Sequence, residues 1–386
     1  MKELINKYFP EMVEVRHAIH RNPELRFEEF QTAQLVADTL TESGYDVQTK
    51  IAKTGVSAIL DSGKPGKTVA LRADMDALPV HEVSDVPYIS QKPGLMHACG
   101  HDGHTATLLL AAKVLQSYRK QFTGKIKFIF QPAEERGNGA HEMIKAGILE
   151  NPKVDAIFGY HNMPTFPKCK VVVRNGCLMA GLEFFRIKVE GVGGHSSKPE
   201  LSIDPVFVGS SIVQALQSII SRNFTPLEAG VVSVTQFHAG TADNVIPHDA
   251  VLRGSIRFNH NDHGEMMQKK IKQIATGVAE SFGAKARVEF IQGTPATINT
   301  IPEADLVRKT AASLYGEGAY IDLEKNVMAV EDFSFYLQKI PGCYFMIGNG
   351  EDTPYCHHPE YRFHDDIMPV AAEMLATTAL NYLNVS

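Results

Sequence analysis

Apolar and mixed segments alternate along the first 180 residues. Short apolar runs bounded by polar or glycine-containing segments indicate buried strands; they lie at 56–60, 68–73, 125–131 and 156–160. Longer segments that contain both apolar and polar residues, or small and aliphatic residues, indicate helices. They lie at 10–42, with an interruption at Asn22-Pro23-Glu24, and at 104–118 and 139–146. Because strands that alternate with helices pair as a largely parallel sheet covered on both faces, this part is predicted to be α/β.

The pattern changes after about residue 180. Residues 184–190 alternate between apolar and polar, which indicates a strand with one solvated face. Asp204-Pro205 favours a helix start, since proline is preferred in the first helical turn. The complete order is β-α-β-β-α-β, that of a ferredoxin-like unit, with strands at 184–190, 230–237, 250–258 and 286–291 and helices at 205–223 and 263–282.

The α/β pattern returns near the C-terminus. Helices are expected at 303–314, 332–338 and 369–383, and a strand at 343–347. We therefore predict a two-domain α/β protein with a mostly parallel sheet. Its main domain is discontinuous, formed by 1–180 and 294–386, and an α+β domain at 181–293 is inserted into it. Glycines near 180–181 and 292–294 are hinge candidates.

Composition excludes several classes of function. The chain has 386 residues and a net charge of -6, with no basic run that would indicate a nucleic-acid partner. The N-terminal residues are charged and predict no secretory signal, and the apolar stretch at 108–115 is too short to cross a bilayer. We expect a cytoplasmic enzyme without a membrane partner. An odd number of scattered cysteines also argues against a disulfide framework; these are Cys99, Cys169, Cys177, Cys343 and Cys356.

One cysteine lies in a segment rich in metal-binding residues, His97-Ala98-Cys99-Gly100-His101-Asp102-Gly103-His104. The two glycines allow the backbone to bend, so that neighbouring side chains can converge. A thiolate two residues from an imidazole suits zinc, manganese, cobalt or nickel. Asp102 could cap the helix that follows or orient a ligating histidine. His104 is expected near the site without being a ligand.

Other candidate ligands follow predicted strands, where an α/β sheet presents its functional edge. They are Asp74 and Asp76, Glu134 and Glu135, His161, and His357 and His358. Adjacent glutamates point in different directions, so one could bind a metal while the other holds the attacking water. Each group also has a plainer interpretation, because Asp74 and Asp76 could be loop or capping residues and the glutamates a solvated acidic pair.

Long motifs in a fixed order give the chain a family resemblance. It resembles the aminoacylase/carboxypeptidase-type family of dinuclear metallohydrolases, and within it the amidohydrolase branch of hippurate hydrolases, N-acyl-amino-acid amidohydrolases and auxin-conjugate hydrolases. The motifs extend over essentially the whole chain; they are Arg16–Leu25, Leu71–Pro79, Met96–His104, Gln131–Glu135, Gly193–Pro199, Asp243–Pro247 and His357–Pro359.

The resemblance implies a role for individual residues. Cys99 matches a ligand that bridges two metal ions, and Glu134 matches the general base. The last ligand of the family is the histidine of a His-x-Pro triplet, which favours His357 over His358. The implied metal ligands are Cys99, His101, Glu135, His161 and His357. The implied cofactors are two divalent ions, Zn²⁺ or Mn²⁺, with Ni²⁺ or Co²⁺ as alternatives.

The inserted domain is implied to act as a lid and to carry a dimer contact. His195 and Asn244 on it match groups that hold the substrate and its tetrahedral oxyanion. Because this domain commonly dimerises in the family, a homodimer or higher homo-oligomer is expected, and His195 could act within its chain or across subunits. Cys356 departs from the family pattern, since relatives often have an aliphatic residue there.

The predicted activity is hydrolysis of N-acyl amino acids, such as N-acetyl or N-benzoyl derivatives, to a carboxylic acid and a free amino acid. A dipeptidase or exopeptidase of the same fold is the alternative. A non-catalytic metal-binding protein is less favoured, since a binder needs ligands but no proton acceptor such as Glu134. The sequence leaves the acyl group, the amino acid, the physiological metal and the pathway open.

Overall fold

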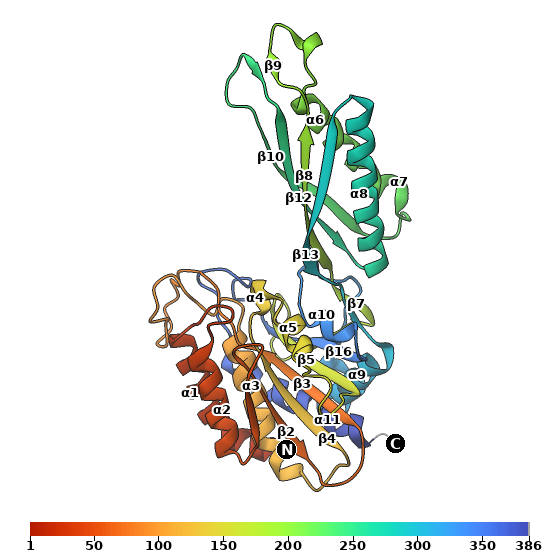
Figure 1. Ribbon diagram of the computed structural model, residues 1–386. Helices are drawn as coiled ribbons and strands as arrows, with labels where there is room; N and C mark the ends of the chain where they lie inside the picture. The colour runs from red at the N-terminus through yellow and green to blue at the C-terminus, as the bar shows by residue number, and fades with distance from the viewer. Residues whose placement is uncertain (385–386) are drawn as a thin grey trace. The chain divides into compact units, whose positions relative to one another are not determined.

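The computed structural model describes residues 1–384, apart from the side chains at positions 136, 137 and 292. The chain forms two compact units (Figure 1). The first comprises Met1–Leu178, Thr297–Lys325 and Asp332–Ser386, and the second comprises Met179–Ala296 and Asn326–Glu331. The segment Asn326–Glu331 thus groups with the second unit, whereas the sequence placed it in the main domain.

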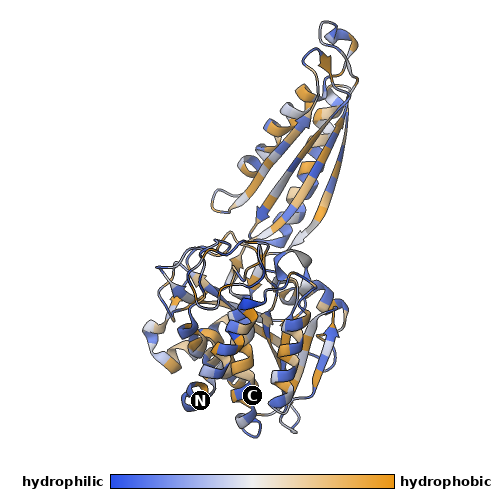
Figure 2. Cartoon of the chain, turned by 90° about the vertical axis from the view of Figure 1, so that its left-hand side faces the viewer, coloured by the Kyte–Doolittle hydropathy of each residue, from blue (hydrophilic) through white to orange (hydrophobic). Residues whose placement is uncertain are grey.

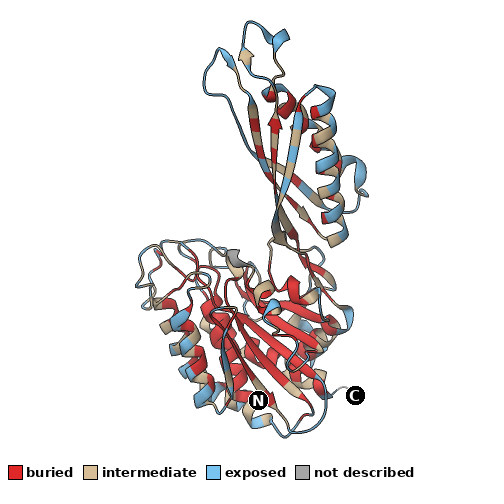
Figure 3. Cartoon of the chain, viewed as in Figure 1, coloured by how far each residue is buried: buried red, intermediate tan, exposed pale blue. Residues whose placement is uncertain are grey.

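An eight-stranded sheet forms the centre of the first unit. Its order is β1 (Val47–Ile51), β2 (Gly55–Asp61), β4 (Lys125–Gln131), β3 (Thr68–Asp74), β5 (Ala156–Pro164), β16 (Gly342–Gly350), β6 (Val171–Val173) and β15 (Tyr320–Asp322). The central strands β4, β3, β5 and β16 run parallel to one another. Every residue of β3, β5 and β16 is buried, as central parallel strands require (Figure 3).

Helices pack against this sheet. α3 and α11 contact β3, α9 contacts β16, and α5 contacts β4. The α-helices of the unit are α1 (Lys2–Arg21), α2 (Phe30–Glu42), α3 (His101–Leu115), α4 (Glu134–Gly137), α5 (Gly139–Lys145), α9 (Ile301–Tyr315), α10 (Ser334–Leu337) and α11 (Met368–Asn384). Short 3₁₀ turns lie at Gln116–Tyr118, Glu317–Ala319 and Asp365–Ile367. Two further strands, β7 (Gly176–Met179) and β14 (Thr297–Asn299), pair with each other.

The second unit has a four-stranded sheet in the order β10, β12, β8, β13, with neighbouring strands antiparallel. Its elements follow the chain as β8 (Gly181–Glu190), α6 (Pro205–Leu216), α7 (Ser218–Asn223), β10 (Gly230–Ala239), β12 (Asp249–Phe258), α8 (Asn261–Ser281) and β13 (Lys285–Thr294). A small ribbon, β9 (Gly194–His195) with β11 (Val245–Ile246), and a 3₁₀ turn at Pro199–Leu201 complete it. Buried and less buried residues alternate along β12, and apolar and polar residues are interspersed along the strands of this sheet (Figure 2).

The predicted fold class is confirmed, and several element boundaries are corrected. The first helix begins at Lys2 rather than near residue 10, and the helix predicted over 205–223 divides at Gln217. β5 continues to Pro164, so His161 lies within a strand and not after it. The strand can include polar residues because buried partners satisfy them: Asn162 bonds to His104 and Tyr361. No helix among residues 1–384 is both long and apolar enough to cross a membrane.

Candidate metal centre

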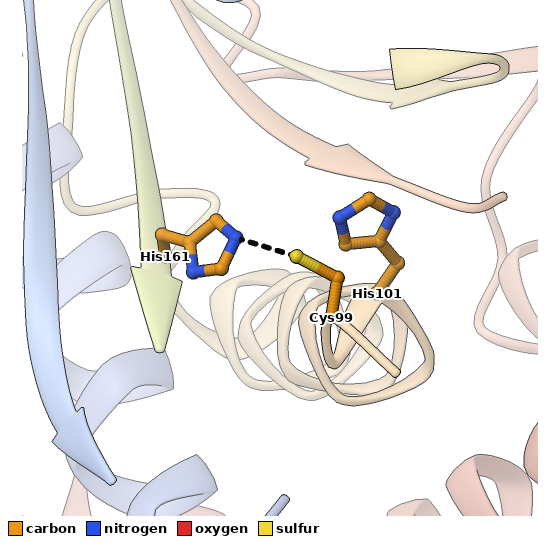
Figure 4. Close-up of side chains that lie close together, drawn as sticks. All are labelled: Cys99, His101 and His161. Carbon is orange, nitrogen blue, oxygen red and sulfur yellow. Dashed lines mark hydrogen bonds between the residues drawn. The ribbon is translucent and has the colours of Figure 1, made fainter. Parts of the chain in front are cut away.

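The site is built around the turn that precedes α3. Gly100 adopts a left-handed conformation with φ 90°, and an added Cβ there would lie 2.4 Å from Asn162 Oδ1 and 2.8 Å from Tyr361 Oη. Only glycine fits this turn. The turn places Cys99 and His101 beside each other, and His161 on β5 faces them (Figure 4). Cys99 Sγ lies 3.4 Å from His161 Nε2, and the donor atoms of all three residues lie within 4.8 Å of one another.

Cys99 also belongs to a second group of donors. Its sulfur, a carboxylate oxygen of Glu135 and a ring nitrogen of His357 lie within 4.8 Å of one another, and His357 Nε2 is 3.3 Å from Glu135 Oε1. The backbone N–H of His357 donates to Ala98 O at 2.7 Å, which fixes this loop beside Cys99. The structure thus brings together the five predicted ligands, with Cys99 common to both groups.

The adjacent histidine, His358, belongs to none of the donor groups found among the described residues. Its Nδ1 accepts a hydrogen bond from Glu360 N at 3.1 Å. The geometry therefore agrees with the choice of His357 that the His-x-Pro triplet suggested.

Each of the two buried histidines uses its Nδ1 in a hydrogen bond to a backbone carbonyl. His101 Nδ1 lies 2.9 Å from Asp76 O, and His161 Nδ1 lies 2.5 Å from Asn162 O. Because a carbonyl oxygen can only accept, each Nδ1 carries a hydrogen, so in the neutral ring that a metal binds the lone pair is on Nε2. His101 Nε2 is buried without a hydrogen-bond partner in the part of the chain that the structure describes. A divalent cation between these donors would satisfy it, so the donor set fits a metal.

Electrostatics differ between these two rings. Burial lowers the pKa of His161 well below its ordinary value, which keeps the ring neutral. Burial also acts to lower the pKa of His101, but Asp74 and Asp76 outweigh it and hold the pKa well above the ordinary value. The surroundings of His101 are therefore strongly negative, as expected of a cation site.

Asp76 connects the ligands to the glutamate pair. Its Oδ1 accepts from Glu134 N and its Oδ2 from Glu135 N, both at 3.0 Å, while Oδ1 lies 3.3 Å from His101 Nδ1. The sequence indicated Asp76 as a candidate ligand or as a loop or capping residue, and the structure shows it as an acceptor for the backbone of the glutamate pair. The sequence did show a carboxylate at a strand end, two residues after another carboxylate. It could not show which groups this carboxylate binds, because its backbone partners lie 58 and 59 residues away.

The suggestion that Asp102 orients a ligating histidine is wrong. Its Oδ2 accepts from Arg16 Nη1 at 2.8 Å and lies 2.9 Å from His20 Nδ1, so it joins α3 to α1. His20 lies beside Asp102; burial lowers the pKa of His20, but Asp102 outweighs burial and raises it to about 9. Consecutive helical residues point about 100° apart, so Asp102 faces α1 while His101 faces the metal donors.

His104 lies near the site without a free nitrogen. Its Nδ1 is 2.6 Å from Asp74 Oδ1 and its Nε2 is 2.6 Å from Asn162 Oδ1. Asp74 in turn accepts from Arg72 Nη1 at 2.7 Å. This chain of buried hydrogen bonds joins β3, α3 and β5, which carry or precede the ligands.

His195 and Asn244 lie together in the second unit. β9 pairs with β11, so that His195 is opposite Val245, and Ser196 N donates to Asn244 O at 3.0 Å. Both residues are exposed. His195 Nδ1 accepts from Ser197 N at 3.1 Å, so a neutral ring carries its hydrogen on Nε2. His195 therefore offers an exposed N–H donor.

The chain is similar to known proteins over most of its length. Residues 70–381 match the profile of peptidase family M20/M25/M40. The chain belongs to this family. It is 42% identical over 373 residues to a hippurate hydrolase of Campylobacter jejuni, covering 97% of each chain. It is 38% identical over 381 residues to thermostable carboxypeptidase 2 of Saccharolobus solfataricus, covering 97% of this chain and 95% of the relative.

A solved structure resembles the whole chain. A dinuclear metal-binding peptidase of family M20 from Bacillus subtilis superposes with a TM-score of 0.87 at 32% identity, covering 99% of this chain and 100% of the other. The resemblance that the sequence motifs indicated is therefore confirmed.

Proposed function

We propose that this M20-family chain is a metal-dependent amidohydrolase that cleaves N-acyl amino acids to a carboxylic acid and a free amino acid. The observation that carries the proposal is the position of Cys99, which belongs to two groups of donors at once. A single tetrahedral metal ion needs four ligands. Five donors in two groups that have the Cys99 thiol in common suit two ions. Cys99, His101, Glu135, His161 and His357 would hold them, with Zn²⁺ or Mn²⁺ favoured and Ni²⁺ or Co²⁺ as alternatives.

Glu134 is the proposed general base. Divalent ions in such a site lower the pKa of water from 15.7 to about 7. A carboxylate of Glu134 lies within 4.8 Å of the donor atoms of His101 and Glu135, and its Oε1 accepts from Asp332 N at 3.3 Å. Glu135 faces His357 instead. Glu134 would take the proton from the attacking water and return it to the nitrogen of the leaving amino acid.

His195 and Asn244 would bind the substrate and its tetrahedral oxyanion through the inserted domain. The exposed Nε2–H of His195 is a suitable donor for developing negative charge. We also propose that this domain acts as a lid, with hinges near 180–181 and 292–294, and that it carries a homodimer contact. A cytoplasmic location remains a prediction.

Replacing His195 with alanine should therefore lower kcat by roughly 10²–10³, since that is the usual loss for one oxyanion donor. The metal content, measured by elemental analysis, should not change, because His195 lies in the other unit from the proposed ligands. Ser197→Ala is a matched control, since it removes only the hydroxyl 2.8 Å from His195 Nδ1. A normal kcat for His195→Ala would contradict the role in catalysis.

The second candidate is an exopeptidase, favoured by the similarity to a carboxypeptidase. Both reactions attack an amide carbonyl, so the centre itself suits either. A panel of N-acetyl, N-benzoyl and longer N-acyl amino acids, compared with dipeptides on the metal-loaded protein, separates them. We expect kcat/KM to be highest for an N-acyl amino acid. Faster cleavage of dipeptides would favour the exopeptidase, and no hydrolysis of either class would refute the proposed function.

A further inference from the structure

Glu29 is a buried carboxylate that the proposed mechanism does not use. It lies just before α2 and is 0% exposed. Its Oε1 accepts from Phe27 N and from Ala133 N, both at 2.9 Å, and its Oε2 accepts from Thr54 Oγ1 at 2.6 Å. All three donors are neutral groups, two backbone N–H groups and one hydroxyl, so these contacts hold the carboxylate by hydrogen bonding and not by ion pairing.

One of these donors belongs to the turn that precedes the glutamate pair. Ala133 has φ 57° and ψ 44°, a left-handed conformation that is unfavourable for a residue with a Cβ. Such conformations persist only where surrounding contacts hold them. Ala133 is fully buried, and Glu29 supplies the acceptor that its N–H requires. Gly139 N closes the turn by donating to Ala133 O at 3.1 Å.

Two carboxylates therefore hold three consecutive backbone N–H groups. Glu29 accepts from Ala133 N, and Asp76 accepts from Glu134 N and Glu135 N. The first contact sets the turn after β4, and the other two set the start of α4. The directions of the Glu134 and Glu135 side chains depend on both.

We propose that Glu29 is a positioning residue: it holds Ala133 in the left-handed conformation and so directs Glu134 and Glu135 to the metal centre. This inference rests on the proposed roles of the two glutamates. Burial raises the pKa of Glu29 to about 7, which shows that this environment disfavours its charge. Burying the Glu29 carboxylate costs free energy, and its hydrogen bond from Ala133 N is a structural reason for its position.

Glu29→Ala should lower both kcat and the affinity for divalent metal by roughly 10–100-fold, the usual effect of removing an outer hydrogen-bond partner of a metal site. KM should change little, since Glu29 does not touch the substrate. Glu29→Gln should stay close to wild type, because the amide oxygen can still accept from Phe27 N and Ala133 N while the hydroxyl of Thr54 reverses its role. Metal affinity is measured by competition with a chromophoric chelator and needs no substrate.

Two further variants separate positioning from a loss of stability. Thr54→Val removes the hydrogen bond to Oε2 and leaves the contact to Ala133, so it should destabilise the fold but retain kcat and metal affinity. Ala133→Gly, added to Glu29→Ala, should recover part of kcat and part of the metal affinity, since glycine adopts the left-handed conformation without a penalty. If Glu29→Ala does not fold, Glu29→Asp replaces it, because the shorter side chain withdraws the acceptor from Ala133.

Recovery by Ala133→Gly together with a near-normal Thr54→Val would support the proposal. It would be overturned if Thr54→Val and Glu29→Ala lost metal affinity equally, or if glycine at 133 restored nothing in a folded Glu29→Ala chain. The chelator titration involves no substrate. A wild-type protein that binds metal but hydrolyses no N-acyl amino acid would therefore refute the proposed function and leave the test of Glu29 by metal affinity unaffected.

Discussion

Replacing Glu134 with glutamine is expected to lower kcat by roughly 10²–10⁴ while the bound metal stays unchanged. The amide has nearly the same shape as the carboxylate but cannot take a proton from water. Its oxygen can still accept from Asp332 N, which contacts Glu134 Oε1 at 3.3 Å. The loss of rate should therefore arise from proton transfer and not from a displaced loop. Steady-state kinetics and elemental analysis of the same preparation test this.

The neighbouring residue supplies the matched control. Glu135→Gln makes the same chemical change at the next residue, whose backbone N–H also donates to the Asp76 carboxylate. Because Glu135 faces His357 and Cys99, this variant should lose metal as well as turnover. The two variants should differ in metal content and resemble each other in activity. If Glu134→Gln kept a near-normal kcat, the base would lie elsewhere, and Asp102 would be a poor substitute because Arg16 and His20 already bind it.

The architecture is predictable from local signals in the sequence, whereas the set of five donors follows from the family resemblance of the longer motifs. Alternating strands and helices indicate the α/β class, and the clustering of Cys99 and His101 with two glycines and further histidines marks a candidate metal site. The actions of Asp76 and Glu29 could not be found in the same way. Both bind backbone N–H groups of residues 133–135, and only the folded sheet brings those groups to them.

Other errors have equally specific causes. The suggestion that Asp102 orients a ligating histidine, one of two alternatives, rests on its proximity to His101 in sequence, whereas the helical rotation between the two residues directs Asp102 to α1. His161 was placed after its strand because a histidine followed by an asparagine reads as polar, yet buried partners satisfy both. Short strands such as β6 and β15 carry too few residues for a recognisable period and were missed.

Replacing Cys99 with alanine is expected to reduce the bound metal from about two ions per chain to one or fewer, and to abolish most activity. The reason is its shared position, since its sulfur lies within 4.8 Å of donors from both groups. Of the five proposed ligands, Cys99 alone belongs both to the group with His101 and His161 and to the group with Glu135 and His357. Cys356→Ala is the matched control: it deletes the neighbouring thiol, which belongs to neither donor group among the described residues.

The pH dependence of metal binding provides a second test of Cys99. A hydrogen bond with Cys356, together with burial, raises the pKa of the Cys99 thiol well above its ordinary value in the metal-free protein. The thiol is then protonated at neutral pH, and metal must displace this proton to bind the thiolate. Metal affinity should therefore rise between pH 6 and pH 8, with a steeper slope for wild type than for Cys99→Ala, as measured by chelator competition. Unchanged stoichiometry, slope and activity in Cys99→Ala would contradict a bridging thiolate, whereas a shallower slope with one ion lost would identify it.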